Sequence, residues 1–158
     1  MAVYLFVPGI KGSVTEKNHK DWIKVDSMQF GVGRAISTPV GASQQREAGQ
    51  PSVSEITVSK PMDNSSIELF GWSVAKFDAK KLKIDIVSTG RDDPFTQFEL
   101  ENAVISGYSI SAPGEGMPSE SISFNFTKIQ NKFMPTGTDQ KAGTPVVKAY
   151  DLAEAKAS

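Results

Sequence analysis

The 158-residue chain contains no cysteine and a single histidine, His19. Without cysteine, a disulfide framework, a zinc–thiolate site and a cysteine nucleophile are all excluded, which fits a reducing compartment. One histidine in a polar stretch supports neither a histidine metal cluster nor a catalytic triad. Acidic and basic residues nearly balance, with a formal net charge of −1, so the basic surface of a nucleic-acid-binding protein is not expected.

Long hydrophobic runs are also missing. The most apolar stretch near the start, residues 3–10, is too short to span a membrane. No basic residues precede it and no small-residue cleavage pattern follows, so we interpret it as a strand rather than a signal peptide. Membrane insertion is therefore not expected. A content of 39% hydrophobic and 22% charged residues is typical of a soluble globular chain, and the length favours one domain over residues 1–158.

The clearest structural signal is the stretch SESISFNFTKIQNKF at residues 119–133. Its apolar residues first alternate with polar ones at a period of two, which is typical of a half-buried β-strand. They then move to Ile129 and Phe133, so the phase slips near Thr127 and Lys128. A β-bulge would explain the slip, and a long strand that bends in this way suits a strand that wraps around a barrel.

Full or partial alternation and turn signals predict strands in six further stretches. They are residues 2–7, 22–30, 53–60, 80–87, 95–111 and 146–150. The long stretches 95–111 and 119–133 are joined by a short loop and should form an antiparallel hairpin. The last residues, about 151–158, are expected to be a flexible tail. The predicted fold class is mainly β, a mostly antiparallel barrel or sandwich with one helix on its flank.

One helix is predicted over residues 65–76. Ser65 and Glu68 match the S-x-x-E capping box, in which each side chain bonds a backbone N–H of the first turn. Apolar residues recur at helical spacing and predict the face that packs on the sheet. They are Ile67, Phe70 and Val74, widened by Leu69 and Trp72. Gly71 weakens the helix by about 1 kcal/mol relative to alanine, so packing of this face should stabilise it.

Residues 33–52, GRAISTPVGASQQREAGQPS, resemble a core segment least. They are rich in glycine, proline, serine and glutamine and show almost no apolar periodicity. A structureless connection of about twenty residues is unusual in a compact domain. The segment is therefore either a disordered surface loop or one that makes contacts outside its own subunit.

Candidate catalytic motifs are weak. Ser73 and Lys76 match the S-x-x-K pattern of serine acyl-enzymes, but the S-D-N and K-T-G elements that accompany it are missing. The glycine pair at residues 31–33 lacks the third glycine of a phosphate-binding loop. Glu99 and Glu101 project from the solvent face of a predicted strand, where charged residues belong. We therefore expect no enzyme activity, no cofactor and no metal ion.

Three stretches carry a resemblance to a known family. They are IKGSVTEKNHKDWIKVDSMQFGVG at residues 10–33, VSEITVSKPMDNSS at residues 53–66 and PSESISFNFTKIQNKF at residues 118–133. Their shared features include a histidine before an I-x-V strand, an Asp-x-x-Ser at the helix start and a closing strand with Glu and Asn-Phe. In order and spacing they resemble the Hcp family, the haemolysin-coregulated proteins that form the inner tube of type VI secretion systems.

The resemblance implies a closed antiparallel β-barrel of two sheets with one flanking helix and a long extended loop. It also implies a homohexameric ring, rings stacked into a tube, and a role without catalysis. A contractile sheath would drive the tube, with a spike protein at its tip, while small effectors are carried or chaperoned in the lumen. The protein would assemble in the bacterial cytoplasm. It would then be secreted to the extracellular space or a target cell without a cleavable signal peptide.

Two other functions stay open from the sequence. A phage-like tail-tube subunit of another contractile injection machine would share this architecture. A small hydrolase on a β scaffold is the other alternative, although the lone histidine, the missing cysteine and the lack of a convergent acidic cluster speak against it.

The resemblance also suggests where contacts are made. The extended loop would contact neighbouring subunits or the next ring, through polar residues that can form and release hydrogen bonds. Those residues are Arg34, Gln44, Gln45, Arg46 and Glu47. Strand alternation and the resemblance together give candidates for a weakly polar lumen wall. They are Ser27, Gln29, Thr57 and Ser59.

Overall fold

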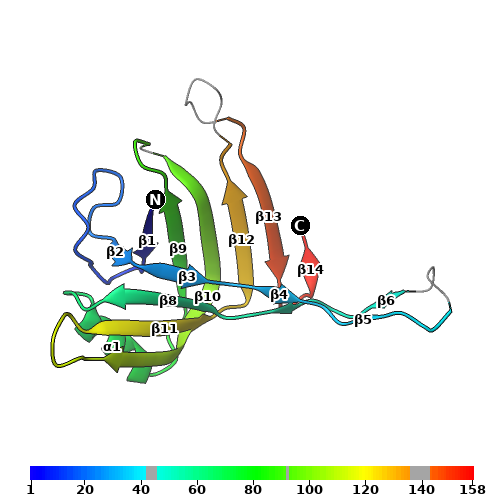
Figure 1. The fold of residues 1–158 in the computed structure, drawn as a ribbon, viewed down its shortest axis with the longest axis horizontal. Helices are drawn as coiled ribbons and strands as arrows, with labels where there is room; N and C mark the ends of the chain where they lie inside the picture. Colours follow the sequence, from blue (N-terminus) through cyan, green and yellow to red (C-terminus); the bar gives the residue numbers. More distant parts are fainter. Residues whose placement is uncertain (42–45, 92, 136–142) are drawn as a thin grey trace.

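The computed structural model describes residues 1–41, 46–91, 93–135 and 143–158. The described part consists of two β-sheets that share one long strand, a short helix at the side and a narrow arm (Figure 1). The long sheet has the order β2 (Ile23–Val25), β1 (Ala2–Phe6), β9 (Lys80–Val87), the first half of β10 (Pro94–Ser111), β12 (Lys128–Phe133), β13 (Val146–Asp151) and β14 (Lys156–Ala157). The short sheet has the order β3 (Ser27–Gln29), β8 (Ile56–Pro61), β11 (Ser119–Asn125) and the second half of β10.

Strand β10 joins the two sheets because its halves pair with different partners. Residues 96–101 pair with β12, and residues 104–111 pair with β11, both antiparallel. Both partners come from the stretch 119–133, so the predicted hairpin is confirmed. The predicted phase slip near Thr127 and Lys128 is also confirmed, because the chain leaves the ladder after β11 and rejoins it at Lys128.

No described ladder closes either sheet into a barrel, which differs from the expected closed barrel. At the corner away from β10, the chain instead passes directly from one sheet to the other. Strand β2 pairs with β1 of the long sheet, and β3, which follows it, pairs with β8 of the short sheet. Between them the N–H of Asp26 donates to the carbonyl of Ser59 (2.8 Å). At Asp26 the chain therefore changes from pairing with the long sheet to pairing with the short sheet, and this change connects the two sheets at that corner.

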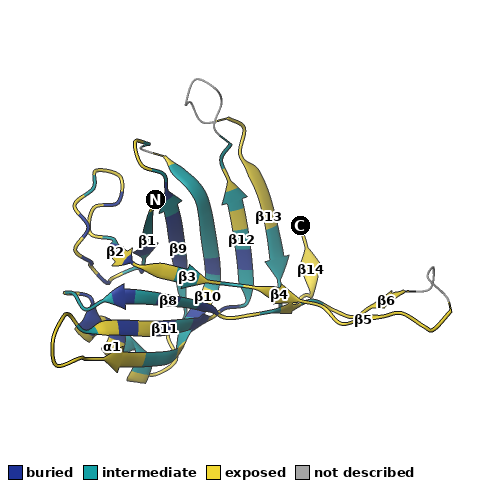
Figure 2. Ribbon diagram, viewed as in Figure 1, coloured by how far each residue is buried: buried dark blue, intermediate teal, exposed yellow. Residues whose placement is uncertain are grey.

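The core lies between the sheets and follows the alternation of their strands (Figure 2). Its fully buried members from the long sheet include Leu5, Ile23, Ile84 and Leu100, and from the short sheet Ile56, Val58, Ile122 and Phe124. Burial of each such side chain contributes about 1.5–3 kcal/mol. Because side chains alternate along a strand, the other face of each sheet is left for solvent, loops or partners.

The helix α1 (Ser66–Val74) lies where it is predicted but ends two residues earlier. Its N-cap residue Ser65 makes no side-chain capping bond, so the predicted capping box is wrong. The Ser65 hydroxyl donates instead to the Asp63 carboxylate, which also accepts the Ser65 backbone N–H (2.9 Å). Asp63 therefore holds the N-cap residue in place, and its carbonyl accepts the N–H of Ser66 (3.2 Å).

The predicted packing face of α1 is also wrong in part. Leu69 is fully buried and Trp72 packs over Phe124, with ring centroids 6.2 Å apart. Ile67, Phe70 and Val74, the centre of the predicted stripe, are exposed. The helix is rotated because Ser66 is buried and its hydroxyl donates to the Glu120 carboxylate, which turns the stripe towards solvent.

A buried polar cluster anchors this end of the short sheet. Lys60 and Glu120 are both 0% exposed, and the Lys60 ammonium donates to the carboxylates of Glu120 and Asp63, each at 3.1 Å. The Tyr108 hydroxyl donates to the other Glu120 oxygen (2.6 Å). Burial and this carboxylate raise the pKa of Tyr108. The cluster joins β8, β10 and β11 to the start of α1.

The C-terminal residues form a hairpin instead of the expected flexible tail. Strand β14 pairs with the end of β13, opposite Tyr150 and Asp151. The Asp151 carboxylate accepts the N–H groups of Ala153 and Glu154 (2.9 and 3.1 Å). An aspartate that closes a turn in this way gives the short, polar tail a partner that its composition does not reveal.

Candidate functional surfaces

The four residues predicted to line a lumen lie together on one face of the short sheet. The register places Ser27 opposite Ser59 and Gln29 opposite Thr57. The residues between them, Met28 and Val58, point to the core side. Geometry therefore groups these four side chains on the side of the sheet away from the core.

Serines from β10 and β11 that were not among the predicted candidates extend the same face. Ser121 lies opposite both Ser59 and Ser109, and Ser123 lies opposite Thr57. We call the whole set the hydroxyl face. It comprises Ser27, Gln29, Thr57, Ser59, Ser109, Ser121 and Ser123. The alternation in residues 119–133 already marks Ser121 and Ser123 as the wet side of a strand. The register of β10 shifts between residues 105 and 107, so alternation along the sequence does not reveal that Ser109 lies on this face.

The hydroxyl face has no charged residue and no reactive group. Its side chains bond weakly to one another, as in the contact between the Thr57 and Ser123 hydroxyls (3.2 Å). A carboxylate appears only past the start of β8, where Glu55 accepts bonds from Ser106 (2.6 Å) and Asn125 (3.4 Å). Hydroxyls that exchange partners with water suit weak, reversible contact and not chemistry.

The segment expected to be a long extended loop, residues 33–52, is a two-stranded arm in its described part (Figure 1). At its base β4 (Val32–Gly33) pairs with β7 (Ser52–Val53), and farther out β5 (Ile36–Ser37) pairs with β6 (Glu47–Ala48). The N–H of Gly49 donates to the carbonyl of Ala35 (2.8 Å) between the two pairings. Nearly all of the arm is exposed (Figure 2), so it holds its shape without a core of its own.

Three of the five predicted arm residues are described. Arg34, Arg46 and Glu47 are all exposed, and within the described ranges no ion pair joins them. Glu47 lies opposite Ser37. Gln44 and Gln45 lie outside the described residues. The structure therefore spreads the described candidates along the arm and does not gather them into one site.

His19 is buried and holds a loop on the outer side of the long sheet. Its Nδ1 bonds the Glu16 carboxylate, and its Nε2 lies 2.8 Å from the Asp85 carboxylate. The ring also packs against Tyr4 and Trp22, with centroids 4.8 and 4.7 Å away. The bond from His19 lowers the pKa of the Glu16 carboxyl. Both ring nitrogens are occupied by carboxylates on different sides, so a single metal ion cannot bridge all three groups.

Asp85 is buried although it lies on the outer face of β9. Its alternation with Leu82 and Ile84 puts it with Lys81 and Lys83 on the solvent face of β9, yet Asp85 is buried. The loop around His19 covers it, and Gln97 donates to its second oxygen (2.6 Å). Alternation assigned the face correctly but could not show that a loop covers it.

The described residues form neither a metal-binding cluster nor a membrane-spanning helix. No group of three or more His, Asp or Glu side chains is placed to hold a metal ion. No helix there is long and apolar enough to cross a membrane.

These observations define the class: a mainly β protein that presents a polar sheet face and a projecting arm, with its lone histidine used in packing. Residues 4–133 match the family model for "Type VI secretion system effector, Hcp". That match covers most of the chain, so the chain belongs to the Hcp family of type VI secretion systems.

Solved structures share this fold. The chain is similar to one described as "Structure of a type six secretion system protein", with 25% identity, a TM-score of 0.91 and 99% of each chain covered. It is also similar to Hcp1 of Salmonella typhimurium, with 16% identity, a TM-score of 0.80 and 99% and 98% of the two chains covered. A type VI secretion system effector from Yersinia pestis gives 17% identity and a TM-score of 0.75 over 94% and 98% of the chains. Curated protein sequences gave no match.

Proposed function

We propose that the chain is the tube subunit of a type VI secretion system, in which six copies form a ring and rings stack into the expelled inner tube. Family membership supports the machine. The observation that carries the proposal at the level of residues is the hydroxyl face, an uncharged polar surface across all four strands of one sheet.

A lumen wall needs to stay hydrated without binding its cargo tightly. Ser27, Gln29, Thr57 and Ser59 offer hydroxyl and amide groups, which bond water and cargo with similar strength. Fixed charges would hold cargo of opposite sign and repel cargo of like sign. An uncharged wall therefore suits small effectors of varied composition, which ride in the lumen or are chaperoned there.

The arm supplies the contact between rings in this proposal. It projects away from both sheets and buries almost none of its surface within its own chain (Figure 2). Standard specific interfaces bury about 1,600 Å² in total, and an exposed two-stranded arm can provide much of one. Its polar side chains, including Arg34, Arg46 and Glu47, suit a contact that forms during assembly and releases after delivery.

The remaining parts of the proposal follow from the family. The tube carries a spike protein at its tip, is driven by contractile sheath proteins, and is secreted without acting as an enzyme. It assembles in the bacterial cytoplasm before export. The family match favours this machine over a phage-like tail tube of another contractile device.

The absence of cysteine allows a direct test of the lumen assignment. A Ser121→Cys variant places one thiol on the hydroxyl face, and a Lys81→Cys variant places one on the exposed side of β9 as the matched control. In assembled tubes, a small maleimide should label both thiols, whereas a maleimide coupled to a protein should label only the control. Equal labelling of both by the bulky reagent would show that the hydroxyl face does not line a lumen.

A further inference from the structure

Several large apolar side chains on and around helix α1 are exposed. Ile67, Phe70, Val74 and Phe77 are 72%, 52%, 68% and 83% exposed, and Ile110 of β10 is 47% exposed. Phe70 packs against Tyr108, two residues before Ile110, with ring centroids 6.0 Å apart. These five exposed residues are called the ridge. Soluble monomers rarely expose apolar patches of this kind unless the patch binds something.

An apolar hollow lies at another place on the molecule. It has a volume of about 220 Å³ and lies between the base of the arm and strands β12 and β13. Its apolar lining includes Phe30, Val32, Pro51, Val53, Ile129 and Tyr150. The hollow is large enough to take an aromatic side chain such as those of the ridge.

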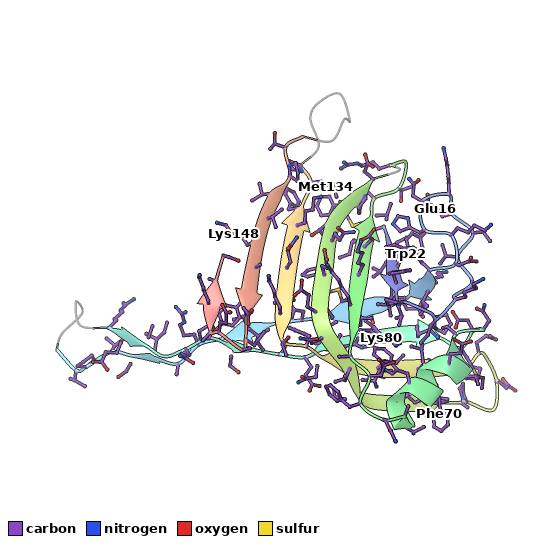
Figure 3. The ribbon with its side chains drawn as sticks, turned by 180° about the vertical axis from the view of Figure 1, so that it is seen from behind. Glu16, Trp22, Phe70, Lys80, Met134 and Lys148 are labelled. Carbon is purple, nitrogen blue, oxygen red and sulfur yellow. The ribbon has the colours of Figure 1, made fainter. Side chains whose placement is uncertain are left out.

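The ridge and the hollow flank opposite edges of the short sheet. The ridge adjoins the second half of β10, which among the described strands pairs only with β11. The hollow begins at Phe30, directly after β3, which in the same set pairs only with β8. Phe70 on α1 and Lys148 at the hollow rim accordingly lie at separate places in the molecule (Figure 3). The ridge of one chain therefore cannot fill the hollow of the same chain.

We propose that the ridge of one copy docks into the hollow of the next copy, head to tail, with both strand edges covered in the same contact. Two different surfaces that meet in this way form a heterologous interface, which produces a closed ring when the rotation per copy closes. Opposite charges beside the surfaces, Glu68 on α1 and Lys148 at the hollow rim, favour the same orientation. This inference rests on the proposed ring and names the residues that make it.

The test uses one exposed position on each surface, so that folding is left intact. Phe70→Glu charges the ridge and Val32→Glu charges the hollow. Lys76→Glu, an exposed change just past α1, and Val40→Glu, an exposed change farther out on the arm, are the matched controls. Circular dichroism and thermal melts confirm that each variant folds, and light scattering on a sizing column gives its mass.

Each surface variant alone should be monomeric, and both controls should form rings as the wild type does. An equimolar mixture of Phe70→Glu and Val32→Glu should form a species of two chains, because one intact ridge can still meet one intact hollow. Rings that persist in either surface variant, or a mixture that stays monomeric, would overturn the inference while leaving the proposed tube function in place. A wild type that forms no rings would instead remove the proposed function and this interface with it.

Discussion

At the scale of single residues, the most informative feature is the pair of fully buried charges Lys60 and Glu120. Each lies in phase with apolar residues of its own strand: Lys60 with Ile56 and Val58, and Glu120 with Ile122 and Phe124. A charged residue in phase with buried apolar residues indicates that the core contains a partner of opposite charge. That signal was readable, but the partners belong to strands 60 residues apart, which no local pattern connects.

The pair predicts an asymmetric response to mutation. Glu120→Leu leaves the Lys60 ammonium buried with fewer partners, so the free energy of unfolding should fall by about 3–5 kcal/mol. The double variant Lys60→Met with Glu120→Leu removes both charges and should lose clearly less than Glu120→Leu alone. Urea unfolding of the single and double variants measures this, and a loss in the double variant as large as in Glu120→Leu or larger would contradict the prediction.

The contacts of His19 with Glu16 and Asp85, here called the His19 clasp, predict that the stability of this loop depends on pH. The bond from His19 lowers the pKa of Glu16 below the ordinary value of 4.5. A carboxyl with a lowered folded-state pKa stabilises the fold above its unfolded pKa, and this stabilisation is lost as pH falls through the folded value. The loop should therefore loosen in acid, below about pH 4.5.

The fluorescence of Trp22 should report whether the His19 clasp is intact, because the Trp22 ring packs against His19. In a Trp72→Phe background, Trp22 fluorescence should change as the pH is lowered through the acid range. Adding Glu16→Gln should remove the part of the change that comes from Glu16. An identical acid transition in both proteins would contradict the role given to this carboxyl.

At the scale of elements, the strands were largely predictable and the helix face and the arm were not. Alternation in residues 119–133 gave the strand, its break and its hairpin partner. For α1, the spacing of Ile67, Phe70 and Val74 indicated a buried stripe, but the anchoring of Ser66 on Glu120 rotates it outwards. The arm pairs residues with no alternation, such as Ile36 with Ala48, so its ladder comes from backbone bonds alone.

The arm predicts a separation between forming a ring and stacking rings. Ala35 and Gly49 already face each other across the ladder, so residues 36–48 can be replaced by Asn-Gly, a pair that favours a tight two-residue turn. The shortened protein should fold and form rings of unchanged mass but no longer tubes. Electron microscopy shows the difference, and tubes of normal length from the shortened protein would rule out the arm as the contact between rings.

At the scale of the whole molecule, three ordered motifs in the sequence were enough to predict the family. Composition and periodicity alone did not predict a ring. The hydroxyl face is built from strands that lie far apart in the chain, β3, β8, β10 and β11. Ser109 joins Ser121 only through the register of β10. Periodicity describes one strand at a time and does not show which strands pair or in what register, so it cannot predict such a surface.

If the hydroxyl face lines a lumen, as proposed, bulky side chains on it should block cargo and leave assembly intact. Replacing Ser27 and Gln29 by tryptophan should preserve rings, because both side chains are exposed and lie away from the core. Retention of a small effector that co-purifies with the wild type should fall at least tenfold. Lys81→Trp on the long sheet is the control and should retain the effector, and unchanged retention in the double tryptophan variant would count against the lumen.

The most direct measurement of the central claim is the mass of the purified protein by light scattering behind a sizing column, with negative-stain images of the same peak. The tube-subunit function predicts a mass of about six chains and ring-shaped particles with an open centre. A monomer that persists at high protein concentration, with no rings in the images, would contradict it.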